Sequence, residues 1–516
     1  MRIRKFAGIL CGVVLAGGVC GLPSGIASEV KGMREVRLEG DMKLTLEGAV
    51  DIALKQNPQI LEAQKEIERV YGLYMEVRAE ALPKASILAS YSQQDEALSA
   101  GGGLAELFGG GGNQDKSWRV ALQGTQVLYA GGQVRGALNI AKHELDAAKF
   151  QLQNVVDQVI ELVRTQYYET LRNRALIEVQ EESVELLTEE LRDQQSRFDA
   201  GTVPRFNVLR AEVELANVQP MLIRAENNYR ISLLNLAKTL GMDYDRSRKA
   251  MVPFEVVTEF DLTDVTLELA DAMAMALERR AFLKAQRQQI LSQSEQVKVA
   301  FSGYLPRLEA NAGYEVRNDQ FSNNLDDTLD GWFFGVQGNW NIFDGFATAG
   351  RLKQARAALQ SAVIRYEDSV RQVELEVQEV YSRLQEAREL IASQQKNVEQ
   401  ATEALRLSRE RLSAGAGTQL DILDARVALT RAQTTELEAK FDFARAKAQF
   451  YRVTAVDTDY DEVFEDPLSK QRRRLWKQMD SRVEELIREL KKEDSGKHST
   501  SEQEVALEAE LSSHRK

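Results

Sequence analysis

The sequence predicts a mainly α-helical fold with a membrane β-barrel, in which a helix–hairpin–helix unit occurs twice. Landmarks recur in the same order in both halves, where Thr45-Leu46-Glu47 returns as Thr266-Leu267-Glu268 and Trp118 returns as Trp332. Each half also holds one very long helical pattern and two alternating apolar–polar stretches. Only 8 prolines occur in 516 residues, which favours long helices over a mosaic of turn-rich modules.

The N-terminus predicts an export signal. Basic residues within 2–5 precede an apolar core over 9–19 that is too short to span a bilayer, and we assign 1–27 to a signal peptide. Cys11 and Cys20 both lie in this segment, so the exported chain has no thiol chemistry. The net charge of −13 disfavours nucleic acid as a partner.

The two structural repeats are expected at 43–240 and 266–456. A helix over 46–56 is followed by Asn57-Pro58, which suits a helix cap and the first helical position of the next helix. In the first repeat, barrel strands are then expected at about 85–95 and 117–129 and a long helix at about 133–200. In the second repeat, the strands are expected at about 307–317 and 331–343 and the long helix at about 347–414.

The long helices carry apolar or small residues every seven positions, which predicts a left-handed coiled coil. An ordinary amphipathic helix is the alternative. Each long helix is expected to form an antiparallel pair with the helix that follows it, at 205–240 and 420–455. The positions are Val156, Val163, Thr170, Ile177, Val184, Leu191 and Phe198 in the first repeat, and Val377, Leu384, Ile391, Val398, Leu405 and Leu412 in the second.

The alternating stretches have the length and pattern of membrane strands. In the last one, Trp332, Phe334 and Val336 fall on one side and Gly335 and Gln337 on the other. A soluble sheet covering a core is the alternative, but the chain offers no cover. Four strands cannot close a barrel, and open edges are not tolerated in lipid, so several chains must contribute strands. The Gly-rich segment within 99–117 is interpreted as an external loop.

The ordered duplication resembles the TolC family of outer-membrane efflux ducts. The resemblance covers about residues 43–456. The motifs that carry it are the Leu82-Pro83 break, the strand ends LYAGG and IFDGF, and the Ala-Gly-Thr turns. It implies a homotrimer with a 12-stranded barrel in the outer membrane of a Gram-negative cell and a helical tunnel across the periplasm. It also implies a periplasmic adaptor (membrane fusion) protein and an inner-membrane pump as partners, with efflux or type I secretion as the function.

The turn after the second long helix carries the candidate site. In the family, aspartates matching Asp421 and Asp424 line the tunnel entrance, and a trimer would gather six carboxylates, which favour cations and raise one another's pKa. The alternative is that Asp421 caps the helix and Asp424 takes a capping-box position. Arg210, at the matching place in the first repeat, is a candidate entrance latch. In one family member a Tyr shortly before this Gly-Thr and an Arg just after it close the entrance, whereas Ala414 and Gln419 stand at these places here, which puts that particular lock in doubt.

No catalytic or metal-ligating constellation is found, so we expect no enzyme activity, no cofactor and no metal. Residues 467–516 form a charged C-terminal extension with an amphipathic stripe that includes Val483 and Leu486. A structural, envelope-spanning coiled-coil scaffold without transport is the alternative function. The strand alternation favours the duct, because a scaffold needs no polar inner face.

Overall fold

The computed structural model describes residues 42–93, 116–242, 252, 254–257, 259–318, 325–456, 481–490 and 492. The expected signal peptide, nearly all of the Gly-rich segment and most of the 467–516 extension lie outside this part of the chain. The described residues divide into two units. The smaller unit contains a parallel pair of short strands, β1 (Met42–Leu44) and β4 (Phe254–Val256).

The larger unit contains the two repeats. The first repeat supplies α3 (Leu46–Gln56), α4 (Pro58–Ala79), α6 (Gln133–Asp199) and α7 (Arg205–Leu240). The second supplies α8 (Leu269–Arg279), α9 (Ala281–Phe301), the 3-10 turn η3 (Ser302–Tyr304), α10 (Ala347–Ser413) and α11 (Gln419–Thr454). At 67 residues each, α6 and α10 are about 100 Å long.

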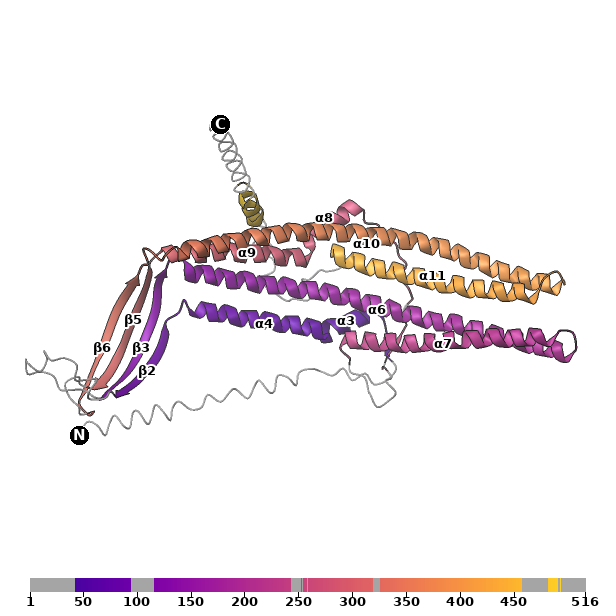
Figure 1. Cartoon of the computed structure of the whole chain (residues 1–516), viewed down its shortest axis with the longest axis horizontal. Helices are drawn as coiled ribbons and strands as arrows, with labels where there is room; N and C mark the ends of the chain where they lie inside the picture. The colour runs from indigo at the N-terminus through magenta and orange to yellow at the C-terminus, as the bar shows by residue number, and fades with distance from the viewer. Residues whose placement is uncertain are drawn as a thin grey trace, which may run out of the picture. The chain divides into compact units, whose positions relative to one another are not determined.

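Shorter helices stacked end to end line each long helix, as the helix lengths predict. In Figure 1, α4, α3 and α7 follow one another along α6, and α9 and α11 run along α10. Asn57 makes the first junction: its Oδ1 accepts a hydrogen bond from the amide of Gln59 at 2.8 Å, and its Nδ2 donates to the carbonyl of Thr239 at 2.7 Å. One side chain therefore caps α4 and ties it to the end of α7.

The seven-residue stripe is buried along part of each long helix. In α6, Val156, Val163 and Thr170 are buried, whereas Phe198 is exposed. Beyond Thr170 the buried positions move to a second seven-residue series. That series is Asn173, Gln180, Leu187 and Gln194. The buried face of α6 therefore becomes mostly polar where the apolar stripe ends.

Four strands form one antiparallel sheet at the end of the unit opposite the helix–helix turns (Figure 1). They are β2 (Lys84–Gln93), β3 (Lys116–Ala130), β5 (Arg307–Asn318) and β6 (Thr328–Asn339), in the order β2-β3-β5-β6. The last strand was expected to reach residue 343, but β6 ends at Asn339 because its partner β5 begins at Arg307, directly after Pro306. Residues 340–343 therefore have no strand to pair with.

The register confirms one apolar and one polar face. Tyr314 lies opposite both Leu122 and Trp332, and directly opposed residues share a face. On this face Trp332 is 81% and Phe334 66% exposed within the single chain. The other face carries ion pairs, including Arg119 with Glu315 at 2.6 Å. Among the described helices, none combines the length and apolar character needed to cross a membrane.

Candidate functional site

The turn between α10 and α11 ends in a capping box. The Oγ1 of Thr418 accepts a hydrogen bond from the amide of Asp421, and the Oδ2 of Asp421 accepts one from the amide of Thr418 at 2.8 Å. Thr418 is therefore the N-cap and Asp421 the third helical residue. The expectation that Asp421 is the cap and Asp424 its capping-box partner is wrong by three residues, because a Thr immediately before the helix takes the cap position first.

Capping changes the acidity of Asp421. The hydrogen bond from the Thr418 amide, with the one from its side chain, lowers the pKa of the Asp421 carboxyl below its ordinary value. Within one chain the local effect is thus opposite to the rise expected from like-charge repulsion between subunits. Asp421 is exposed to solvent, and its lowered pKa keeps it ionised at neutral pH.

A cavity of about 970 Å³ separates the two helical hairpins near their tips. It is lined by residues of α6, α7 and α11 and by Leu405 of α10, and both Asp424 and Arg210 contribute to its wall. The two predicted site residues from different repeats are thus brought to one cavity. Among the described residues, no ion pair joins Arg210 to Asp421 or Asp424.

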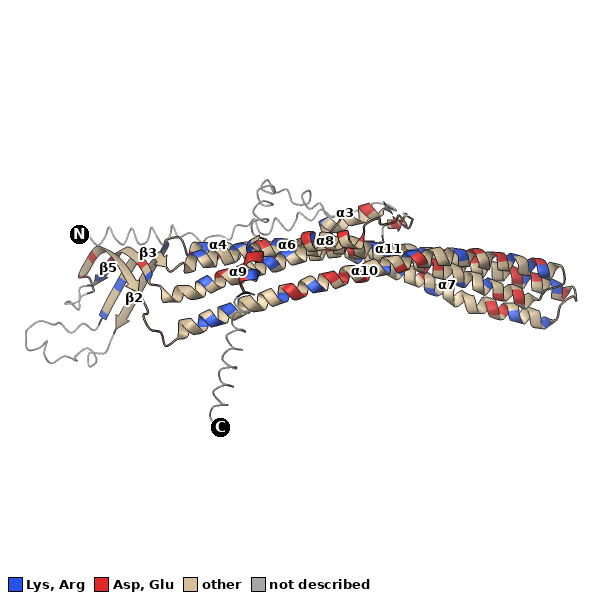
Figure 2. Cartoon of the chain, turned by 90° about the horizontal axis from the view of Figure 1, so that it is seen from above, with Lys and Arg blue, Asp and Glu red and all other residues tan. Residues whose placement is uncertain are grey.

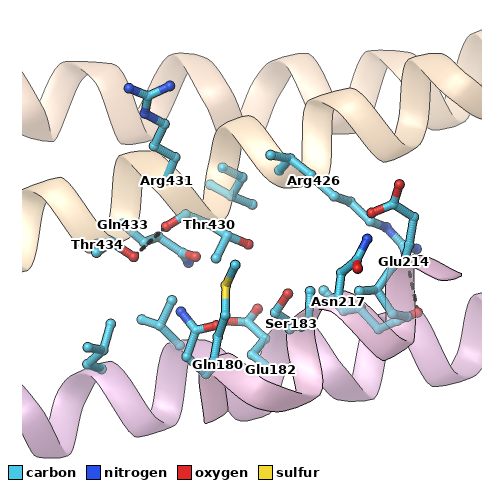
Figure 3. Close-up of a pocket in the computed structure, with 18 of the residues that line it drawn as sticks. Gln180, Glu182, Ser183, Glu214, Asn217, Arg426, Thr430, Arg431, Gln433 and Thr434 are labelled. Atoms are coloured by element: carbon cyan, nitrogen blue, oxygen red, sulfur yellow. Dashed lines mark hydrogen bonds between the residues drawn. The ribbon is translucent and has the colours of Figure 1, made fainter. Parts of the chain in front are cut away.

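Arg426 crosses this cavity instead. Its Nη1 donates to the carbonyl of Leu186 at 2.9 Å, and its Nη2 lies 3.6 Å from Oε2 of Glu190. Figure 3 shows the Arg426 side chain reaching from α11 toward the facing helices. Burial lowers the pKa of Arg426, whose side chain is only 14% exposed.

Glu190 of α6 contacts two residues of the opposite hairpin. Besides the Arg426 pair, its Oε1 accepts hydrogen bonds from Gln419 of α11 and, at 2.8 Å, from Gln194 of its own helix. We refer to Arg426, Glu190 and Gln419 as the tip clasp. The sequence does not predict the tip clasp, because Glu190 lies in the first repeat and its partners in the second, and no local motif marks any of the three residues.

The described residues contain no group of three or more His, Cys, Asp or Glu placed to hold a metal ion. What the fold presents is a sheet with one apolar face at one end, long antiparallel helical hairpins, and a cavity near the tips of these hairpins. These features define the class of membrane channel-tunnels, in which helical hairpins continue a set of membrane strands.

The comparison with known sequences gives the family. The profile of the outer membrane efflux protein family matches residues 49–242 and 272–456, one segment in each repeat and together more than half of the chain. The chain belongs to this family and is a protein of the outer membrane. The family consists of channel-tunnels and is not a family of enzymes.

Relatives are distant but extend over most of the chain. The outer membrane protein TolC of Vibrio cholerae is 22% identical over 79% of this chain and 90% of its own length. The solvent efflux pump outer membrane protein SrpC of Pseudomonas putida is 22% identical over 78% of this chain and 83% of its own length. The alkaline protease secretion protein AprF of Pseudomonas aeruginosa is 22% identical over 52% of this chain and 55% of its own length.

Solved structures share the fold. The outer membrane protein VceC of Vibrio cholerae superposes with a TM-score of 0.68 at 20% identity, covering 79% of this chain and 95% of that one. The CmeC channel of Campylobacter jejuni gives a TM-score of 0.70 at 18% identity, covering 79% and 85%. The predicted fold class and family are therefore confirmed.

Proposed function

We propose that three copies of the chain form a gated duct that receives substrates from a periplasmic adaptor and an inner-membrane pump. The observation that carries this proposal is the sheet. Its outer strands, β2 and β6, each have one unpaired edge, and its apolar face is exposed. Lipid does not tolerate an open edge, so β2 of one copy would pair with β6 of the next. The number of copies comes from the family, for which three copies would close twelve strands.

Exposed apolar side chains on the helices support the same assembly. On α7, Phe206, Val213 and Ile223 are each more than half exposed in the single chain. In the proposed assembly these side chains would be covered where neighbouring copies meet. The adaptor and pump follow from the family, and the relatives named for solvent efflux and for protease secretion support both small molecules and polypeptides as cargo classes.

We expect the full chain, purified in detergent, to have three times the protein mass of one copy and to conduct ions in planar bilayers. The mass is measured by light scattering with the detergent contribution subtracted. A stable single-copy particle without conductance contradicts the duct. A trimer that never conducts supports the structural scaffold instead, so the two measurements together separate the two functions.

We also propose that Asp421 and Asp424 are the entrance carboxylates. Three pairs of acidic groups around one axis favour cations. The double variant Asp421→Asn with Asp424→Asn is expected to lower the cation-to-anion permeability ratio, read from the reversal potential in a salt gradient. Asn at both positions preserves side-chain size and much of the capping geometry. An unchanged reversal potential contradicts this assignment. Asp442→Asn, on α11 further from the tip, is the charge-matched control.

A further inference from the structure

Unpartnered arginines meet where the sheet joins the helices. A cavity of about 550 Å³ is lined by Arg135 of α6, Arg356 of α10 and Arg482 of the C-terminal helical segment 481–490. Among the described residues, none of the three has a carboxylate partner. The cavity has two further charged residues, Lys298 and Glu295, and these pair with each other at 2.5 Å. Three positive charges therefore remain without a counter-charge.

The C-terminal segment is a built part of this site. Val483, next to Arg482, is buried in the core formed by the second repeat, and Leu486, Ile487 and Leu490 pack against that core. This anchoring places the third arginine on the cavity. The described part of the amphipathic stripe predicted in the C-terminal extension therefore packs against the second repeat.

The surrounding surface is basic as well. The first twenty residues of α10, 347–366, contain Arg351, Lys353, Arg356 and Arg365 and no acidic residue, although the whole chain has a net charge of −13. Figure 2 shows this as a blue-only start of α10 on the side of the sheet. Arg351 and Arg307 line a neighbouring cavity of about 570 Å³, but each has a carboxylate partner, Asp344 at 3.5 Å and Glu309 at 2.7 Å, so the unpaired charge is confined to the first cavity.

The depth of the cavity fits a membrane surface. Gly131 and Gly132, which line it, directly follow the last residue of β3. Exposed aromatic side chains lie at the same junction, including Phe301 in the cavity wall and Phe343 and Phe346 in the turn before α10. Aromatic residues mark the headgroup level of membrane proteins, and basic pockets at that level bind anionic lipid headgroups.

We propose that this arginine cavity binds the phosphodiester headgroup of an anionic phospholipid in the inner leaflet of the outer membrane. Guanidinium groups suit phosphate oxygens because they donate paired hydrogen bonds. The headgroup supplies the missing counter-charge, and its acyl chains extend along the exposed aromatic side chains toward the apolar face of the sheet. The proposal requires the outer-membrane location and not the trimeric duct, so lipid binding and conductance can fail independently.

The test is native mass spectrometry of the full chain in detergent, titrated with phosphatidylglycerol or phosphatidylcholine. We expect phosphatidylglycerol to be retained and the triple variant Arg135→Ala, Arg356→Ala, Arg482→Ala to bind it about 100-fold more weakly. The single variant Arg356→Ala, an exposed position that folding tolerates, should lose about fivefold. The control Arg371→Ala with Arg488→Ala removes arginines from α10 and the C-terminal segment outside the cavity and its basic surroundings, and it should bind like the parent.

Three outcomes would overturn the proposal. The first is equal retention of the two lipids, which would show that the anionic headgroup is not recognised. The second is undiminished phosphatidylglycerol binding by both the triple and the single variant. The third is displacement of the lipid by inorganic phosphate at similar concentration, which would make the cavity a site for free anions rather than for lipid.

Discussion

Replacing Glu376 with Gln is expected to lower the free energy of unfolding by about 2 kcal/mol. Glu376 of α10 pairs with Arg280 at 2.6 Å and with Arg452 of α11 at 2.5 Å, and Arg452 also pairs with Glu161 of α6. These four residues join both repeats through one charge network. Removing a carboxylate from a fully buried pair costs about 3–5 kcal/mol, and Glu376 is 24% exposed, so a smaller loss is expected.

The same substitution has a defined pH signature. Burial acts to raise the pKa of Glu376, but the hydrogen bond and charge of Arg280, together with Arg452, lower it below the ordinary value of 4.5. A lowered folded-state pKa adds stability that is present above pH 4.5 and is lost as pH falls through the folded-state pKa. The parent should therefore lose more stability on acidification than Glu376→Gln.

Denaturant unfolding followed by circular dichroism at neutral and acidic pH measures both effects. Glu379→Gln is the matched control, because Glu379 lies on the same helix in an exposed pair with Arg383. An exposed i,i+4 pair contributes roughly 0.3–0.5 kcal/mol, so the control should stay close to the parent. Equal stability of Glu376→Gln and Glu379→Gln at neutral pH would show that the network does not stabilise the fold.

Local pattern predicted most of the fold. The Asn57-Pro58 pair predicts where α4 begins, and the helix Leu46–Gln56 has the bounds expected from its pattern. Alternation in the strands predicts which side chains share a face, because side chains in a strand alternate between the two faces. The end of β6 was missed because strand length depends on the partner β5, and Trp340 continues the alternation after the partner has ended.

The candidate site was only partly predictable. The sequence predicts three site residues at the tip, Asp421, Asp424 and Arg210. In the structure, Arg210 and Asp424 line one cavity. The tip clasp depends on contacts between residues more than 200 positions apart, such as Arg426 with Leu186. Nothing in the local sequence of α11 distinguishes Arg426 from Arg431, which also lines the cavity but in Figure 3 extends away from the facing helices. Long-range pairing of this kind requires the packed hairpins.

Replacing Arg426 with Met is expected to raise the open fraction of the duct about tenfold in planar-bilayer recordings. The tip clasp joins α11 to α6 across the cavity, so in the proposed gated duct it would resist any opening that moves these helices apart. Hydrogen bonds to a charged group contribute roughly 1.5–3 kcal/mol, and 1.4 kcal/mol corresponds to a factor of ten in an equilibrium. Met keeps the apolar length of the side chain, so cavity packing changes little.

Reciprocal and control variants assign the effect to the tip clasp. Glu190→Gln removes the charge on the α6 side and should also raise the open fraction. Arg431→Met, one turn further along α11, should leave it unchanged. Arg210→Met tests the latch expected from the sequence: a rise equal to that of Arg426→Met supports Arg210 as an entrance latch. If Arg426→Met and Arg431→Met conduct alike, the tip clasp does not hold the entrance closed.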